Sequence, residues 1–306
     1  MYSPTLDDLR TLDAAIRTGS LSAAARELGV SQQAASSRLR ELERLVGVTL
    51  AHRSATGVTP TESCRAVLAH VREVLDASAR LDDVLAALSD QATVGSIAVG
   101  ASQTVAAHLL PGWLVHLRRG QEATGRPATE IVLQTANSEQ IIALVRSGGL
   151  DLGFIESPTL PTGLGHAAVA RDRMVVAVHP KHEWVGRASL ALELVASTPL
   201  VTRELGSGTR ATFEAAVRHE LGRDPAAPAL VLATEAAVKS AVASGAAPAV
   251  LSELTIRDDV QLGRISAIPF EAPTISRLFT AIWRGTQRDL TGVRRELVAT
   301  AASISG

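Results

Sequence analysis

The sequence predicts an α+β protein of several domains: a small helical N-terminal domain, a long linking helix and a two-lobed α/β domain. Three patterns predict this order. The first 60 residues contain short amphipathic helices separated by tight turns, and apolar residues then recur in steps of four and three over Glu62–Gln91. From Thr93 onward, strand and helix patterns alternate. With 306 residues, 46% apolar and 20% charged, the chain can form several globular cores.

Residues 20–53 predict two short helices that meet at a three-residue turn, as in a helix-turn-helix. Ser31 can cap the second helix, which leaves Gln32 and Gln33 in its first turn. The predicted apolar stripe comprises Ala35, Leu39, Leu42 and Val46, and the opposite side comprises Gln33, Ser36, Ser37, Arg40 and Arg44. These polar side chains can bond base edges or phosphates, so they predict contact with double-stranded DNA. The alternative is an ordinary amphipathic helix with a solvated face.

Neighbouring segments complete this small domain. A capping signature at Thr5–Asp8 predicts an earlier helix, and the three alanines of the helix Leu21–Leu28 allow another helix to cross closely. Gly47–Pro60 has little helical periodicity and predicts a wing, with Arg53 and Thr59 placed to meet phosphates. A plain surface loop is the alternative for this last segment.

A dense set of residues in this domain forms a recognisable pattern: Gly19–Ala25, Leu28, Ser31–Ser36, Leu42, Glu43, Gly47, Leu50 and Arg53. The pattern resembles the N-terminal domain of LysR-type transcriptional regulators, which usually have Pro where Gln33 stands and Phe where Ala51 stands. The resemblance implies that the recognition helix faces DNA and that the wing meets its backbone. The predicted DNA-binding residues are Ser31, Gln32, Gln33, Ser36, Ser37, Arg38, Arg40, Arg53 and Thr59.

The segment Glu62–Gln91 predicts a linking helix with an apolar seam of about three heptads. The seam comprises Val67, Val71, Val74, Ser78, Leu81, Leu85 and Leu88. Such a seam can join two copies of the chain, or it can lie on the helix's own domain. The resemblance favours a homodimer or homotetramer, because LysR-type proteins pair through this helix.

The remaining chain predicts two α/β lobes. The first contains strands 96–101, 131–135 and 151–155 with helices 105–118 and 138–146. The second contains the apolar segment 174–178, strands 200–202, 230–233 and 249–251, and helices 190–196, 209–221 and 236–244. Residues 278–283 are expected to return to the first lobe. Ligands of open α/β sheets bind where strands end and helices begin, so a cleft is predicted between the lobes.

Polar turns at such strand-to-helix junctions are the candidate ligand contacts. Ser102-Gln103-Thr104, Asn137-Ser138 and Thr234-Glu235 each precede a predicted helix, whose N-terminus favours an anion. Each turn can instead merely cap its helix. The turn that begins at Thr202 is also small and glycine-bearing, but it lacks the ending of a phosphate-binding loop.

Residues 93–306 resemble the effector-binding domain of LysR-type regulators, which is similar to the periplasmic binding proteins. Within that family, the segments around Ser102, Asn137, Glu156 and Arg203 look most like the branch that regulates sulfur assimilation and carbon fixation. That branch suggests a small anionic effector. The predicted effector-binding residues are Ser102, Gln103, Thr104, Asn137, Ser138, Glu156, Thr202, Thr234 and Glu235.

Other classes of protein are disfavoured. The eight histidines show no metal-binding spacing, and Gly206-Ser207-Gly208 does not have the spacing of a nucleophile elbow, so we expect neither a metal nor an enzyme active site. No cofactor other than the effector is expected. Cys64 is the only cysteine, which fits a reduced cytoplasmic protein in which this thiol is buried and inert. No secretory signal and no membrane span are expected.

The predicted domains are a winged helix-turn-helix over 1–61, a linker and dimerisation helix over 62–91, and a two-lobed effector domain of the periplasmic-binding-protein type over 92–306. One lobe is expected from about 92–163 and 267–306, and the other from about 164–266. The predicted function is a sequence-specific transcriptional regulator controlled by an effector in the cleft, with RNA polymerase as a further partner if it activates. The alternative is a two-lobed solute-binding module or small enzyme with a helical assembly domain.

Overall fold

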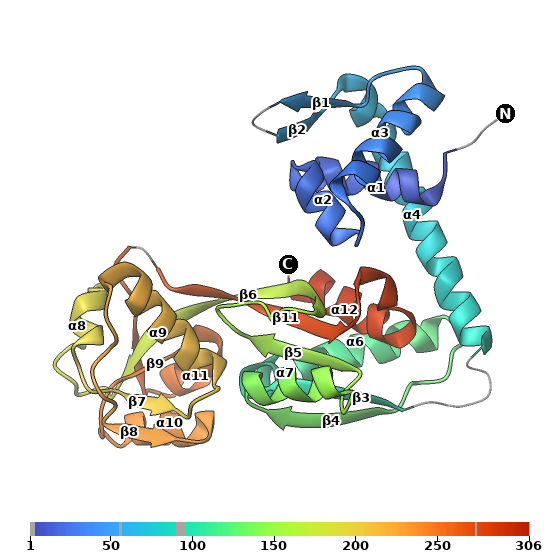
Figure 1. The fold of residues 1–306 in the computed structure, drawn as a ribbon. Coiled ribbons are helices and arrows are strands. Elements are labelled where there is room, and N and C mark those ends of the chain that lie inside the picture. The colour runs from blue at the N-terminus through green and yellow to red at the C-terminus, as the bar shows by residue number, and fades with distance from the viewer. Residues whose placement is uncertain (1–3, 55–56, 90–95, 273, 306) are drawn as a thin grey trace. The chain divides into compact units, whose positions relative to one another are not determined.

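The computed structural model describes residues 4–54, 57–89, 96–272 and 274–305. The chain forms two compact units (Figure 1). The first contains Met1–Thr93 with Gly285–Gly292, and the second contains Val94–Arg284 with Val293–Gly306.

Capped helices build the first unit. Thr5 and Asp8 form a reciprocal capping box, as predicted, and Ser20 and Ser31 cap the next two helices by accepting the backbone N–H of Ala23 and Ala34. The helices are α1 (Leu6–Thr18), α2 (Leu21–Glu27), α3 (Gln32–Val46) and α4 (Glu62–Ser89). Their shared core contains Leu12, Ala15, Ala24, Leu39, Leu42 and Leu50. Val46 lies at the end of α3 and is exposed, so it does not extend the apolar stripe as predicted.

The segment predicted as a wing is an antiparallel hairpin of β1 (Ala51–Ser54) and β2 (Gly57–Pro60), in which His52 pairs with Thr59. The backbone N–H of Val58 donates to the carbonyl of Gly19 at 2.8 Å, which ties the hairpin to the turn between α1 and α2. Gly57 has φ +135°, and a Cβ there would lie 2.6 Å from the Gly19 carbonyl oxygen. Glycine is therefore required at this close approach.

The apolar residues of helix α4 are partly buried in the first unit and partly exposed. Cys64 and Val71 are buried in the core of the first unit, whereas Val67, Val74 and Leu81 are exposed. The side chains of Leu85 and Leu88, and the predicted helix end at Gln91, lie outside the described residues. The exposed valines and leucine recur every seven residues and so lie on one side of the helix.

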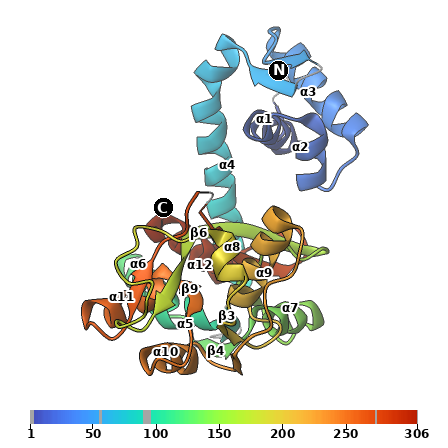
Figure 2. The same ribbon diagram turned by 90° about the vertical axis from the view of Figure 1, so that its left-hand side faces the viewer.

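In the second unit, one lobe is built on parallel strands. Strands β3 (Ile97–Ser102), β4 (Ile131–Ala136) and β5 (Leu152–Glu156) are parallel, with β3 between the other two. The crossover helices α6 (Leu110–Ala123) and α7 (Ser138–Ser147) lie on opposite faces of this sheet (Figure 2). This is expected of right-handed crossovers, because the one from β3 to β4 and the one from β4 to β5 run in opposite directions across the sheet. Parallel strands end together, so the turns after β3, β4 and β5 share one edge.

The other lobe is joined to the first by two long antiparallel strands, β6 (Leu164–Val178) and β11 (Ser276–Arg284). The end of β6 also pairs with β9 (Ala249–Ser252) and β10 (Ser266–Ile268). Strands β7 (Val201–Arg203) and β8 (Leu230–Leu232) form a separate parallel pair. The helices are α8 (Leu192–Ala196), α9 (Gly208–Leu221), α10 (Glu235–Ala243) and α11 (Glu253–Gln261).

Several elements differ from the prediction. The helix expected over 105–118 is two helices, α5 (Gln103–His108) and α6, because Pro111 occupies the first turn of α6 and cannot continue the preceding ladder. The segment 174–178 is only the end of β6. Helix α11, strand β10, the short 3₁₀ helix η1 (Gln287–Asp289) and the last helix α12 (Gly292–Ser305) were not predicted.

Candidate functional site

The outward face of α3 is polar and accessible. Gln32, Gln33, Ser37 and Arg40 are exposed, whereas Ala35, Leu39 and Leu42 on the opposite side are buried. The Arg40 guanidinium donates to the backbone carbonyl of Ser36 at 3.2 Å. Figure 1 shows α3 next to the hairpin of β1 and β2. Thr59 on β2 is exposed as well, so the predicted contacts at the centre of α3 and on the wing are available to a ligand.

The flanks of α3 differ from the prediction, because two arginines assigned to DNA have partners within the protein. Arg38 lies on the side that faces α1, 3.2 Å from the Asp7 carboxylate. Arg53 donates to the Ser36 hydroxyl and to the Glu43 carboxylate, both at 3.2 Å. The other Glu43 oxygen accepts the backbone N–H groups of Leu50 and Ala51.

These ion pairs neutralise most of the positive charge near α3. Residues 31–58 hold four arginines and two glutamates. In the structure Arg38, Arg44 and Arg53 each lie next to a carboxylate. Within the described chain, Arg40 is the arginine of this group with no carboxylate partner. Residues 31–58 of one copy therefore offer little unneutralised charge to a phosphate backbone.

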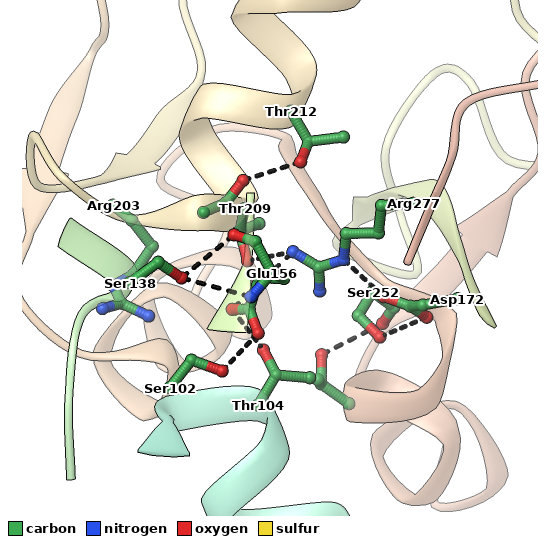
Figure 3. A network of polar contacts seen from close by, with 12 residues as sticks. Ser102, Thr104, Ser138, Glu156, Asp172, Arg203, Thr209, Thr212, Ser252 and Arg277 are labelled. Atoms are coloured by element: carbon green, nitrogen blue, oxygen red, sulfur yellow. Dashed lines mark hydrogen bonds and ion pairs between the residues drawn. The ribbon is translucent and has the colours of Figure 1, made fainter. Parts of the chain in front are cut away.

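In the second unit, three of the predicted effector-binding residues, Ser102, Thr104 and Ser138, contact a fourth, Glu156 (Figure 3). The Ser102 hydroxyl donates to Glu156 Oε2, and the Thr104 hydroxyl lies 3.2 Å from Oε1. Ser138 bonds the backbone of Glu156 from the start of α7. Ser102, Thr104, Ser138 and Glu156 are all buried. The donors expected to hold a ligand thus hold a side chain of the protein.

Arg277 links this cluster to the other lobe. Its Nη1 lies 3.7 Å from Glu156 Oε1 and donates to the Thr209 hydroxyl at 3.0 Å, while its Nε donates to Asp172 at 2.7 Å. Asp172 also accepts from Ser252 at 2.8 Å. Arg277 Nη2 is buried and has no hydrogen-bond partner among the described residues. One buried donor beside Glu156 is therefore unused.

A second set of contacts joins the lobes at Glu235, the first residue of α10. The Glu235 carboxylate lies 3.2 Å from both the Thr104 hydroxyl and the His108 Nε2. Gln103 accepts the backbone N–H of Glu235 at 3.0 Å and donates to the carbonyl of Ala233 at 3.1 Å. The structure therefore brings Gln103 and Thr104 into direct contact with Glu235.

The remaining predicted contacts are less uniform. Asn137 and Thr234 cap α7 and α10 by accepting a backbone N–H, whereas Ser102 caps no helix. Asn137 Nδ2 also donates to the Glu204 carboxylate at 3.3 Å, so capping describes only part of its role. Thr202 lines a separate cavity of about 30 Å³ inside the second lobe, and its buried hydroxyl has no partner among the described residues. Thr209, the partner of Arg277, lines the same cavity.

The cleft also contains more negative charge than the anion prediction assumed. Burial raises the pKa of Glu156, an effect opposed by the nearby Arg277 and by the Ser102 and Thr104 hydroxyls. The neighbouring Glu235 raises it further. A free anion here would meet the carboxyl groups of Glu156 and Glu235. The groups that would attract the anion, Ser102, Thr104 and Arg277, already contact Glu156.

Sequence reasoning missed Arg277, Asp172 and Ser252. Their only signal is a charged or polar residue beside apolar strand residues, as Arg277 stands next to Leu278 and Phe279. A polar residue within a buried strand indicates a partner, but the partner is not visible from the pattern alone.

Two family descriptions match the chain. Residues 6–65 match the "bacterial regulatory helix-turn-helix protein, lysR family" and residues 90–298 match the "LysR substrate binding domain". The chain belongs to the LysR family. This LysR-family chain is thus a DNA-binding transcriptional regulator with an effector-binding domain, and the alternatives of a solute-binding module or an enzyme are set aside.

Relatives of this LysR-family regulator support the assignment over nearly the whole chain. An uncharacterized HTH-type transcriptional regulator of Mycobacterium tuberculosis is 44% identical over 94% of this chain and 93% of its own. The regulator CbbR of Sinorhizobium medicae is 32% identical over 87% of this chain and 82% of its own. The predicted branch within the family stays a prediction.

Solved structures share the fold. Full-length OxyR from Pseudomonas aeruginosa has a TM-score of 0.57 at 22% identity, covering 97% of this chain and 99% of that one. Full-length CbnR in complex with its target DNA has a TM-score of 0.54 at 19% identity, covering 99% and 100%. Among the described residues of this LysR-family chain, no helix is long and apolar enough to cross a membrane.

Proposed function

We propose that the exposed face of α3 reads double-stranded DNA and that the wing contacts its backbone. The observation that carries the proposal is the set of four exposed polar residues at the start and centre of α3, Gln32, Gln33, Ser37 and Arg40. Glutamine is suited to adenine and arginine to guanine or phosphate. Ser31 holds the helix start, and Ser36, Arg38 and Arg53 position α3 against α1 and the wing.

We further propose that the regulator binds DNA as a homodimer or homotetramer. Within the described part of residues 31–58 in one DNA-binding domain, Arg40 is the arginine without a carboxylate partner, so a single copy would bind DNA weakly. Two DNA-binding domains double the number of phosphate contacts. The exposed Val67, Val74 and Leu81 of α4 supply the apolar surface for pairing. A regulator of this kind acts on promoter DNA in the cytoplasm, and it would contact RNA polymerase if it activates transcription.

We propose that the effector binds in the cleft around Glu156 and carries an anionic group. The Ser102 and Thr104 hydroxyls and the Arg277 guanidinium already surround a carboxylate, that of Glu156, and Arg277 Nη2 offers an unused donor. A small anion would take donors from Glu156 and weaken the contacts between the lobes. Asn137, Ser138, Thr234, Glu235 and Gln103 border this position, and binding there would shift the balance between DNA-binding states.

A gel-shift titration on the gene's own upstream DNA tests the DNA-binding surface. Gln33→Ala and Arg40→Ala should each weaken binding about tenfold or more, since a base-reading side chain contributes about 1–3 kcal/mol. Matched controls are Gln261→Ala and Arg187→Ala, which make the same changes at exposed positions of the second unit. Equal effects in the test and control variants would contradict the assignment of α3.

The same titration, repeated with sulfate, phosphate and small carboxylates, tests the cleft. Ser102→Ala should keep its DNA affinity and lose the response to whichever anion alters binding by the wild type. A variant that still responds like the wild type would rule out Ser102 as an effector contact. Circular dichroism confirms that each variant is folded.

A further inference from the structure

A second, larger cavity lies beside the Glu156 cluster, and its lining includes Asp172 and His108, which contact Arg277 and Glu235. It is an open groove of about 580 Å³ in the second unit, lined by the junction of α5 and α6, the middle of β6, α11, the start of β11 and the end of α12. None of the predicted effector-binding residues lines it. Its walls come from both lobes, because α5, α6 and α12 belong to the first lobe and α11 to the second.

The charges on the groove walls do not cancel. Arg173 is paired with Glu253 through two bonds of 2.7 and 3.0 Å. The Asp172 carboxylate is bonded to Arg277 and Ser252, so it is not free to neutralise another cation. Arg171 and Arg257 are exposed, and neither has an ion-pair or hydrogen-bond partner among the described side chains. The groove therefore presents two uncompensated guanidinium groups.

The rest of the lining is largely apolar. Leu109, Leu254 and Ile304 border the groove, together with the aromatic rings of Trp113 and Phe279. Ile304, near the end of α12, is 42% exposed and so is available to a ligand. A concave apolar surface with a few charged groups is typical of a site for a small organic molecule.

We propose that this groove is a second small-molecule site, which binds an organic anion with an apolar body. Arg171 and Arg257 bind the anionic group, since guanidinium is suited to phosphate and carboxylate. Leu109, Leu254 and Ile304 cover the apolar part. A ligand held by Arg171 on β6 and Arg257 on α11 would bind next to the strand that connects the lobes.

The test uses the full-length protein and phenyl phosphate as the probe, with inorganic phosphate and phenol as comparison compounds. Isothermal titration calorimetry should detect saturable binding of phenyl phosphate at about one site per chain. Inorganic phosphate lacks the apolar part and phenol lacks the charge, so both should bind at least about tenfold more weakly.

Arg171→Gln and Arg257→Gln should each weaken phenyl phosphate binding about tenfold. Both residues are exposed, so these variants are expected to fold. Arg187→Gln, an exposed arginine outside the groove, and Ser102→Ala in the cleft should bind the probe like the wild type.

Three results at the groove itself would overturn the proposal: no saturable binding, unchanged affinity in the double variant Arg171→Gln/Arg257→Gln, or phenol binding as tightly as phenyl phosphate. Loss of binding in Ser102→Ala alone would move the probe to the cleft and also overturn it. DNA binding plays no part in this measurement, so its outcome is independent of the proposed regulatory function.

Discussion

Glu156 is the residue on which the cleft depends. Its carboxylate is 2% exposed and accepts hydrogen bonds from Ser102 and Thr104, with Arg277 beside it. Gly208 packs against its backbone so closely that a Cβ would lie 1.6 Å from the Glu156 carbonyl oxygen. Glu156 therefore has little freedom to leave the site, and any effector must bind beside it or exchange donors with it.

Replacing Glu156 should change how stability depends on pH. Burial raises the pKa of Glu156 above 4.5, the value for an exposed glutamate. Between the two pKa values the folded chain binds more protons than the unfolded chain, so this group makes the protein less stable as the pH rises. Glu156→Gln is uncharged throughout, and its melting temperature relative to the wild type should increase from pH 4.5 upward and then level off.

Differential scanning fluorimetry over a pH series measures this difference in melting temperature, taken from the thermal unfolding transition of the second unit. Glu271→Gln, at an exposed position, is the control and should give a curve parallel to that of the wild type. A parallel curve for Glu156→Gln as well would contradict a raised pKa for this buried carboxyl group.

Helix α4 has both an apolar repeat and an exposed apolar surface, and both favour pairing between two copies of the chain. Val71 lies in the core of its own head, so the seven-residue repeat is not all available to a partner. Val67, Val74 and Leu81 remain exposed, at 40%, 47% and 57%. Exposed apolar side chains repeated every seven residues on one side of a helix are typical of a surface that pairs with another helix.

Charged residues on this side of α4 should separate the copies. Val74→Asp with Leu81→Asp would bury carboxylates without partners in the pairing surface, where each apolar side chain otherwise contributes about 1.5–3 kcal/mol. We expect the mass in sedimentation velocity to fall toward that of a monomer. Ala69→Asp, exposed on the opposite side of α4, should leave the mass unchanged. An unchanged mass in the double variant would contradict pairing through this surface.

The elements with a clear local signal were predictable. The capped helices α1 and α3, and the parallel strands β3, β4 and β5, lie close to their predicted ranges, because periodicity and capping residues are encoded locally. The first part of β6 was missed since Arg171, Asp172 and Arg173 interrupt its apolar pattern. These residues are tolerated there because the strand crosses between the lobes.

The composition of the candidate site was only partly predictable, for a related reason. Ser102, Asn137 and Thr234 were found because polar turns precede helices. Arg277 was not, because its partner Asp172 is 105 positions away in the sequence. Arg38 and Arg53 were assigned to DNA by resemblance, whereas their partners Asp7 and Glu43 depend on packing between helices and the wing.

Polar contacts join the two lobes of the second unit at their boundary. Strands β6 and β11 cross it, Glu235 contacts Thr104 and His108, and Arg277 contacts groups of both lobes. An effector that competes for these contacts would change the equilibrium between lobe arrangements by its difference in affinity for them. Arg277 is central, because its side chain is only 1% exposed and lies between two carboxylates.

Removing this arginine should therefore destabilise the whole second unit. Arg277→Met leaves Glu156 and Asp172 buried without their cation, a change that costs about 3–5 kcal/mol for a broken buried pair. The triple variant Arg277→Met/Glu156→Gln/Asp172→Asn removes the unpaired charges as well and should recover much of this loss. Arg119→Met, at an exposed position on α6, is the control. Urea unfolding followed by circular dichroism measures all three, and a triple variant no more stable than Arg277→Met would show that packing, and not charge balance, sets the role of Arg277.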